Sequence, residues 1–259
     1  MTADELDRAL RQLRLGGMAD TLTVRAQQAR AENLGPLDFV SLLVHDELER
    51  RRDRLVTRRI KEASFRDVKT LDTFDWTFNT GIDRALIFEL ATGRFIERRE
   101  DALLLGNPGC GKSHLAQAIG MAAIHGGFHV MYREAHRLFE DLVLADATDE
   151  RAQSIATLSE IPLLIIDDVG MRKLPASAAE DLLEIIMRRY ERASTIITSN
   201  RPIEDWPKLF GDTPAVTAFL DRLMHHCHLI QIRGKSYRLH ESSAIARQRK
   251  SPVNSHASA

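Results

Sequence analysis

The fold of this 259-residue chain is decided by Gly106-Asn107-Pro108-Gly109-Cys110-Gly111-Lys112-Ser113. The pattern, Gly-x-x-x-x-Gly-Lys-Ser, is the phosphate-binding P-loop. Glycines let the backbone bend so that its N–H groups surround phosphate oxygens, and the following helix adds its positive N-terminal end. Lys112 is expected to reach the β- and γ-phosphates, and the Ser113 hydroxyl to ligate Mg²⁺. These residues and His114 are the predicted nucleotide-binding residues.

The sequence on both sides of this loop supports that interpretation. Residues 102–105 (Ala-Leu-Leu-Leu) predict a short buried strand, and residues 114–125 have the apolar spacing of a helix. A glycine-rich turn without a ligand would need neither element. The order strand, loop, helix therefore indicates a P-loop NTPase.

A second strand ends in paired carboxylates. Residues 163–168 read Leu-Leu-Ile-Ile-Asp-Asp, which is the Walker B pattern of a strand buried on both faces that ends where parallel sheets bind ligands. Asp167 is expected to hold Mg²⁺ through its waters, and Asp168 to act as the general base toward the attacking water. The alternative is that the two acids cap a helix, but their position downstream of a P-loop favours the catalytic role.

A third strand, predicted over 194–198, ends at Ser199-Asn200. Asn200 is a candidate for orienting water and touching the γ-phosphate, or it is a turn residue before Arg201-Pro202. Strands and helices alternate along this part of the chain, which predicts an α/β fold, a parallel sheet sandwiched by helices. The other predicted elements are helices at 82–98, 134–146, 149–159, 177–192 and 214–225 and strands at 128–132 and 228–232.

The composition limits the classes of protein to which this chain can belong. Hydrophobic residues make up 44% of the chain and charged residues 28%, with a net charge of only −1, so a nucleic-acid partner would need a local basic surface. No apolar run has membrane-spanning length, the N-terminus lacks a signal-peptide core, and two cysteines do not make a disulfide framework. We expect a cytoplasmic protein without a membrane partner.

The first 66 residues are predicted to form a separate, small all-helical domain. Thr2-Ala3-Asp4-Glu5 is a capping-box start, and Gly16-Gly17 is expected to end the first helix. A second helix is predicted over about 19–31 and a third up to about Ile60. The remaining predicted divisions are a linker at 67–81, the ATPase domain at 82–249 and a disordered Ser/Ala/Pro-rich tail at 250–259.

Three clusters allow more than one interpretation. The basic residues from Arg50 to Arg59 are either a solvated helix surface or a contact for a phosphate backbone or a partner. The aromatic residues of 74–78 either pack the two parts of the chain together, which we favour, or border a nucleotide base. The run His225-His226-Cys227-His228 is disfavoured as a metal site, because adjacent side chains point in different directions and no second ligand pair is near in sequence.

Further stretches carry a family resemblance. They are Leu13-Arg14-Leu15-Gly16-Gly17-Met18-Ala19, Ile96-Glu97-Arg98, residues 103–115, residues 190–200, Leu220-Asp221-Arg222-Leu223-Met224-His225-His226 and Gly234-Lys235-Ser236-Tyr237-Arg238-Leu239. With them the chain resembles the AAA+ ATPases. More closely, it resembles the IstB family, the ATP-binding helper proteins of insertion-sequence transposition, and their DnaC-type helicase-loader relatives.

The resemblance implies further roles and partners. Asn200 would be sensor 1, Arg222 an arginine finger and Arg238 a sensor-2-like arginine, so that Lys112, Asp168, Asn200, Arg222 and Arg238 form the catalytic set. An arginine finger acts on the nucleotide of a neighbouring subunit, which implies self-association into a higher oligomer. Binding of duplex DNA and recruitment of a transposase, with the N-terminal domain as adaptor, are also implied. Many relatives have Asp-Glu in place of Asp167-Asp168, so slow or strongly stimulated turnover is expected.

The leading hypothesis is an ATPase, dependent on Mg²⁺ and stimulated by DNA, that assembles on duplex DNA and recruits or activates a transposase. Arg172, Lys173 and the Arg50–Arg59 cluster are candidate contacts to the DNA backbone, without sequence preference. The alternatives are a loader of a replicative helicase and a nucleotide-gated scaffold with little hydrolysis. A GTPase is disfavoured because the Asn/Thr-Lys-x-Asp guanine signature is absent, and a small-molecule kinase would not need Asn200 and the two late arginines.

Overall fold

The structure is a computed structural model that describes residues 2–211 and 214–240. The chain divides into two compact units, residues 1–59 and 60–259. The tail predicted at 250–259 and the end of the predicted ATPase domain lie outside the described residues. Within the described ranges, every helix is too short or too polar to span a membrane.

A five-stranded parallel sheet is the centre of the described part of the second unit. Its spatial order is β2 (Val130–Glu134), β3 (Leu163–Val169), β4 (Ser194–Ser199), β1 (Asp101–Gly106) and β5 (Cys227–Ile232). All neighbouring strands pair in parallel. The α/β fold predicted from the sequence is therefore confirmed, and β1, β3 and β4 lie side by side with their carboxyl ends at one edge.

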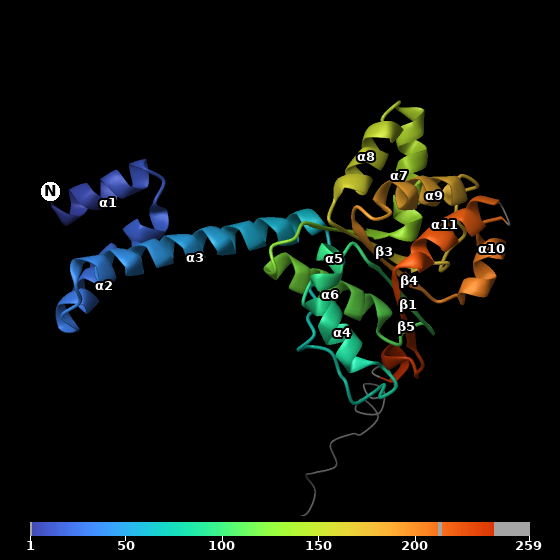
Figure 1. Ribbon diagram of the computed structural model, residues 1–259, viewed down its shortest axis with the longest axis horizontal. Coiled ribbons are helices and arrows are strands. Elements are labelled where there is room, and N and C mark those ends of the chain that lie inside the picture. Colours follow the sequence, from blue (N-terminus) through green and yellow to red (C-terminus); the bar gives the residue numbers. More distant parts are fainter. Residues whose placement is uncertain (1, 212–213, 241–259) are drawn as a thin grey trace, which may run out of the picture. The chain divides into compact units, whose positions relative to one another are not determined.

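Helices cover both faces of this sheet (Figure 1). On one face α6 (Lys112–His125) crosses the strands, with α4 (Arg84–Ala91) and α5 (Arg94–Glu97) near it. Close packing of α6 depends on Gly120, where a Cβ would lie only 2.7 Å from Ile165 Cδ1. The opposite face carries α7 (Ala135–Ala147), α8 (Arg151–Glu160), α9 (Ala178–Arg189) and α11 (Pro214–His225). Two short helices, η1 (Ile203–Asp205) and α10 (Trp206–Leu209), precede α11 in the chain.

Two helix predictions in this unit are corrected. The helix expected over 82–98 is broken at Gly93, whose φ is +79° and whose Cβ position lies 2.8 Å from Phe128 Cε2. The helix expected to reach residue 192 ends at Arg189. The Arg189 side chain is buried, and its guanidinium donates to the carbonyls of Leu158 at 2.7 Å and Ile161 at 2.8 Å. A glycine turn and a buried arginine therefore interrupt patterns that read as continuous helix.

The first unit contains α1 (Ala3–Gln12), α2 (Gly16–Ala31) and most of α3 (Pro36–Ala63). The capping box predicted at Thr2 and Glu5 is present. The prediction that Gly16-Gly17 ends the first helix is wrong, because these glycines begin α2. The Glu47 carboxylate accepts the Gly17 N–H at 2.5 Å, and an acidic group stabilises a helix N-terminus. A Cβ on Gly17 would lie 2.7 Å from Glu47 Cα, so the close approach of α2 to α3 requires glycine.

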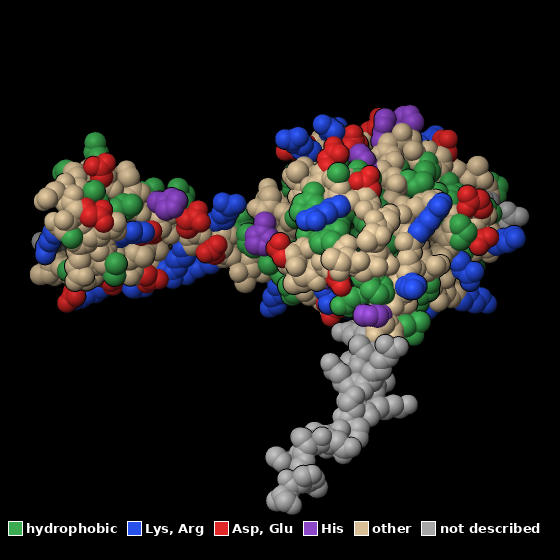
Figure 2. Space-filling view, turned by 90° about the horizontal axis from the view of Figure 1, so that it is seen from below, with side chains coloured by type: hydrophobic (Ala, Val, Ile, Leu, Met, Phe, Trp, Pro, Cys, Tyr) green, Lys and Arg blue, Asp and Glu red, His purple; other side chains and the backbone are tan. Residues whose placement is uncertain are grey.

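The basic stretch of α3 has two kinds of arginine. Arg50 pairs with Asp20 at 2.6 Å and Arg51 with Glu47 at 2.6 Å, so these two side chains stabilise the packing of the first unit. Arg52 and Arg54 are exposed. On the face shown in Figure 2, basic and acidic side chains are interspersed. The cluster is therefore partly structural, and Arg52 and Arg54 are its best candidates for a phosphate contact.

Candidate nucleotide-binding site

The loop between β1 and α6 has the backbone that the P-loop pattern requires. Gly109 and Gly111 have φ of +78° and +107°, in the region that glycine adopts without strain. A Cβ at Gly111 would lie 2.7 Å from Phe74 Cε2, and one at Gly109 would lie 2.2 Å from Ser236 Oγ. Two segments distant in sequence therefore enclose the loop, and a side chain at either glycine would collide with them.

The Lys112 ammonium joins three parts of the site. The residue is only 4% exposed, and its Nζ donates to Gly106 O at 2.8 Å, to Asn107 O at 3.0 Å and to Asn200 Oδ1. Burial lowers the pKa of Lys112, although Cys110 and the two Walker B aspartates act in the opposite direction. The Asn200 Nδ2 group is buried and has no hydrogen-bond partner among the described residues. It is a donor available to a phosphate oxygen or a water.

The two Walker B aspartates have different environments. Asp167 is fully buried, and its carboxylate accepts hydrogen bonds from the Tyr132 hydroxyl at 2.6 Å and from the Thr198 hydroxyl. Asp168 is half-buried and lies 3.7 Å from the Arg66 guanidinium. Burial and the neighbouring Asp167 raise the pKa of Asp168, whereas Arg66, Lys112 and Arg238 act to lower it. Asp167 is therefore fixed, and Asp168 faces the open side of the site.

A bulge in β3 separates these two carboxylates. The pairing of β3 with β4 shifts between Ile166 and Val169, so one extra residue is accommodated on β3. Asp168 has φ of +59°, a conformation that aspartate tolerates better than most residues do. Its N–H donates to Thr198 Oγ1 at 2.9 Å. The bulge turns the second carboxylate toward the cavity beside the P-loop.

A cavity of about 370 Å³ opens at this edge of the sheet. Its lining includes the P-loop residues 108–113, His114, Asp168, Asn200 and Arg238, so most of the predicted site residues meet there. Gly106 and Asn107 contribute through their carbonyls to Lys112. Asp167 is not among the described lining residues, and both of its carboxylate oxygens accept hydrogen bonds. The arrangement can bind an anionic phosphate chain, with cations and backbone on one side and carboxylates on the other.

Aromatic residues of the predicted linker form part of the cavity wall. Phe74 and Phe78 line it, and Phe74 contacts the His114 ring edge-on at 5.1 Å. Trp76 instead packs on Phe88, with centroids 5.5 Å apart. Trp76 therefore packs within the second unit, and the two phenylalanines line the cavity beside the P-loop.

Comparison with known proteins identifies the family. A family model described as IstB-like ATP binding protein matches residues 8–245. This chain belongs to that family. The Pseudomonas aeruginosa protein named as an ATP-binding protein of insertion sequence IS21 is 38% identical over 237 residues, covering 92% of this chain and 89% of that protein. Its counterpart for IS5376 from Geobacillus stearothermophilus is 38% identical over 229 residues, covering 88% of this chain and 91% of that protein.

The solved structure of the DnaC helicase loader has the same fold as this IstB-family chain. Its TM-score is 0.51 at 22% identity, and the match covers 63% of this chain and 96% of that chain. At this identity the likeness concerns the fold alone. It confirms the α/β fold with a parallel sheet predicted from the sequence.

Arg222 of this IstB-family chain lies apart from the cavity. It is on α11, and among the described residues that line the cavity Arg238 is included whereas Arg222 is not. The Arg222 side chain is 40% exposed, pairs with Asp221, and has its guanidinium over the Tyr190 ring at 5.9 Å. The structure therefore does not bring this predicted catalytic arginine to the chain's own P-loop.

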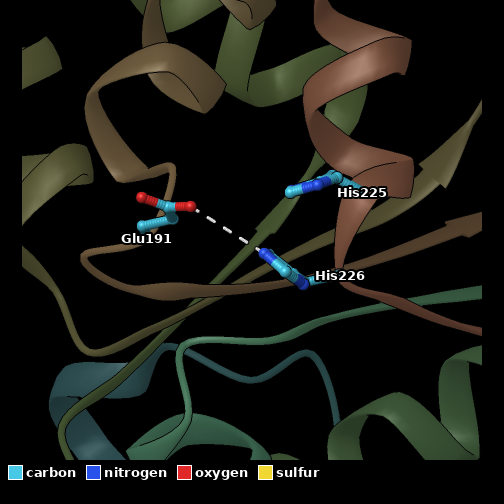
Figure 3. A group of neighbouring side chains, drawn as sticks. All are labelled: Glu191, His225 and His226. Carbon is cyan, nitrogen blue, oxygen red and sulfur yellow. Dashed lines mark ion pairs between the residues drawn. The ribbon is translucent and has the colours of Figure 1, made fainter.

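Two histidines at the end of α11, His225 and His226, lie close to Glu191 (Figure 3). The His226 Nε2 atom is 3.8 Å from Glu191 Oε1, and His225 Nδ1 is 2.8 Å from the Tyr190 hydroxyl. All three side chains are exposed, and their possible ligand atoms lie within 4.8 Å of one another. The ion pair and the hydrogen bond account for these positions as parts of one exposed surface around Tyr190.

Four residues that sequence reasoning missed complete the site. Tyr132 and Thr198 hold Asp167, and Arg66 lies beside Asp168. Asn79 is buried; its Nδ2 donates to Cys110 O at 3.2 Å and to Lys235 O at 3.3 Å, and its Oδ1 accepts the Lys235 N–H at 3.1 Å. The only sequence signal for Thr198 was a hydroxyl within an apolar strand, and the other three depend on contacts between distant segments.

Proposed function

We propose that this protein is a Mg²⁺-dependent ATPase of insertion-sequence transposition that is completed by a second copy of the chain. The observation that carries the proposal is the position of Lys112, whose ammonium contacts the P-loop carbonyls and Asn200 in the cavity that Asp168 also lines. Relatives named as insertion-sequence ATP-binding proteins support ATP as the nucleotide. Phosphate would replace the carbonyl oxygens as the partner of the ammonium.

The oxygen donors of the site fit Mg²⁺. The Ser113 hydroxyl and the Asp167 carboxylate are ligands of the type that this ion prefers, with waters and phosphate oxygens in its other positions. Bound Mg²⁺ would neutralise charge on the phosphates. Each Asp167 oxygen already accepts one hydrogen bond, from Tyr132 or from Thr198. One of these oxygens would accept a second hydrogen bond, from a water bound to Mg²⁺. Asp168, as the half-buried carboxylate, would accept the proton of the attacking water.

The position of Arg222 outside its own cavity supports self-association of the chain. An arginine finger stabilises charge on the transferring phosphoryl group from a neighbouring subunit, and Arg222 is on an exposed face outside the lining of its own cavity. In an assembly, this face would meet the open cavity of the next copy. Arg238, which lines the cavity of its own chain, would act as the arginine in cis.

Duplex DNA is the proposed substrate for assembly. Arg172 and Lys173 are exposed in the loop after β3, close in sequence to Asp168, and Arg52 and Arg54 are exposed on α3. Contacts from such side chains to the backbone would weaken as salt rises and would show little sequence preference. The residues 1–66 would serve as the adaptor that recruits or activates the transposase, and the protein would act in the cytoplasm.

A helicase loader is the second candidate function, because the fold matches the DnaC helicase loader. Pull-downs with the neighbouring transposase and with a replicative helicase separate the two partners. A scaffold with little hydrolysis is the third candidate, favoured by Asp168 in place of the longer glutamate. Wild-type turnover on duplex DNA that equals the Lys112→Ala baseline would support the scaffold.

The experiment that tests the proposal is an ATPase assay with and without duplex DNA, run beside sedimentation of wild type and Arg222→Ala. We expect turnover that rises with protein concentration and with DNA. The Arg222→Ala variant should bind nucleotide and fail to hydrolyse it. Full hydrolysis by a monomer at every concentration would contradict completion by a second copy.

A further inference from the structure

The segment from Phe65 to Asp67 begins two residues after the end of α3. It contacts two elements of the nucleotide site, β2 and α6. The Phe65 ring packs against Tyr132 with centroids 6.0 Å apart, and Tyr132 is the residue whose hydroxyl donates to Asp167. The Asp67 N–H donates to Gln117 Oε1 at 3.0 Å, where Gln117 is 1% exposed in the P-loop helix. These two anchors fix the backbone of the residue between them, Arg66.

The Arg66 guanidinium lies near three carboxylates: its Nε atom is 3.6 Å from Oδ2 of the neighbouring Asp67, and the other two come from strand ends. Its Nη1 atom lies 3.3 Å from Glu134 Oε1 and 3.7 Å from Asp168 Oδ2. Glu134 is the last residue of β2 and pairs in register with Asp167, so the guanidinium spans the ends of two neighbouring strands. Arg66 also lines the cavity, and its side chain is 40% exposed on that side. Among the described cations that act to lower the pKa of Asp168, Arg66 has the largest effect.

We propose that Arg66 is a positioning residue for Asp168: the guanidinium, held by Glu134, keeps this carboxylate in place beside the cavity. The inference rests on the proposed ATPase function. The bulge in β3 supplies one constraint on the backbone, and Arg66 supplies the one on the side chain.

A neighbouring arginine provides a matched control. Arg137 pairs with the same carboxylate, its Nε lying 3.1 Å from Glu134 Oε2, and its side chain is 72% exposed. The ion pairs of the described residues place Arg66 near Asp168 and place Arg137 only at Glu134. Arg137→Ala removes an ion pair of Glu134 and leaves the proposed contact in place.

The test compares Arg66→Ala, Arg66→Lys and Arg137→Ala with wild type. Arg66→Ala should lower kcat about tenfold, because misplacement of a reacting group reduces rate steeply. It should leave the affinity for a fluorescent ATP analogue within about threefold, a difference of less than 1 kcal/mol. Arg66→Lys, which keeps the positive charge, should restore part of kcat, and Arg137→Ala should resemble wild type.

Three results would overturn the proposal. One is an Arg66→Ala variant whose kcat matches wild type. Another is an Arg137→Ala variant that loses as much as Arg66→Ala does, which would assign the effect to Glu134 alone. The third is loss of analogue binding in Arg66→Ala, which would make the arginine a phosphate ligand. If wild type itself turns over no faster than Lys112→Ala, the ATPase proposal fails, and the role of Arg66 fails with it.

Discussion

The P-loop cavity and the surface around Arg222 are built in opposite ways, although both belong to the same unit. Around the cavity, Lys112 is buried among carbonyl oxygens and Asp167 is held by two hydroxyls. On α11, Arg222 is partly exposed and rests on the ring of Tyr190. The first region has the groups that phosphate and Mg²⁺ need. The second offers a cation with no phosphate site beside it in the described part of its own chain. The difference supports the proposal that one chain holds the nucleotide-binding groups and that a second copy completes the site for turnover.

Replacing Arg222 should have the largest effect on that comparison. An arginine finger contributes about 10³-fold or more to kcat, so Arg222→Ala should lose hydrolysis by about that factor and keep nucleotide affinity. Arg188→Ala is the matched control, because Arg188 is an exposed arginine of α9 paired with Glu184 at 2.6 Å. Steady-state assays with a fluorescent nucleotide titration measure both quantities. Equal losses in the two variants would mean that this surface has no specific catalytic arginine.

Asp168→Asn tests the cavity side of the comparison. Loss of a general base costs about 10²-fold or more in kcat, whereas the isosteric amide keeps the shape of the bulge. In wild type, burial and Asp167 raise the pKa of Asp168, so kcat should fall, as pH is lowered, at a higher pH than for an ordinary aspartate. Asp168→Asn should have residual activity without this acidic limb. An unchanged limb in the variant would assign it to another group.

Asn79 tests how strongly the cavity is closed by distant segments. Its side chain connects Cys110 in the P-loop with Lys235. Each of these three hydrogen bonds contributes about 1 kcal/mol, so Asn79→Ala should lower the free energy of unfolding by about 3 kcal/mol. Nucleotide affinity should also fall. Thr77→Ala, at an exposed residue that bonds within its own turn to Asp75, should change neither. Denaturant unfolding with and without nucleotide makes the measurement.

Tyr190 should give the smallest effect. A cation–π contact at an exposed site contributes about 0.5–1 kcal/mol, so Tyr190→Ala should lower kcat about threefold by loosening Arg222. Tyr190→Phe keeps the ring, loses only the hydroxyl next to His225, and should keep wild-type kcat. Should phenylalanine behave like alanine, the hydroxyl rather than the ring would position Arg222.

The sequence predicts the fold and the motif residues of the site more completely than it predicts the other residues. The P-loop and the Walker B strand are continuous in sequence, and their residue types follow directly from phosphate binding and from burial in a parallel sheet. Asn200 was a candidate because it follows the end of a predicted strand, whereas the role of Arg222 came from the family resemblance. Gly16-Gly17 was misread because a glycine pair is equally suited to a helix end and to a close approach of two helices, and only Glu47 on α3 distinguishes them.

The remaining site residues depend on contacts that no local pattern records. Tyr132, Arg66 and Asn79 reach the site from three different segments, and each is one polar residue among many in the sequence. The bulge at Asp168 is likewise a property of strand pairing, since one additional residue on β3 alters register without altering the apolar pattern. Sequence motifs therefore predict the groups that touch phosphate better than the groups that hold them in place.

Mixing two inactive variants tests the central claim most directly. Lys112→Ala lacks the phosphate-binding ammonium and keeps Arg222, whereas Arg222→Ala keeps a complete P-loop. If a second copy completes the site, each variant alone should be inactive, and a mixture should recover ATPase activity that rises with protein concentration and with duplex DNA. A mixture that stays as inactive as its components, beside a wild type whose activity per chain is the same at every concentration, would contradict the account.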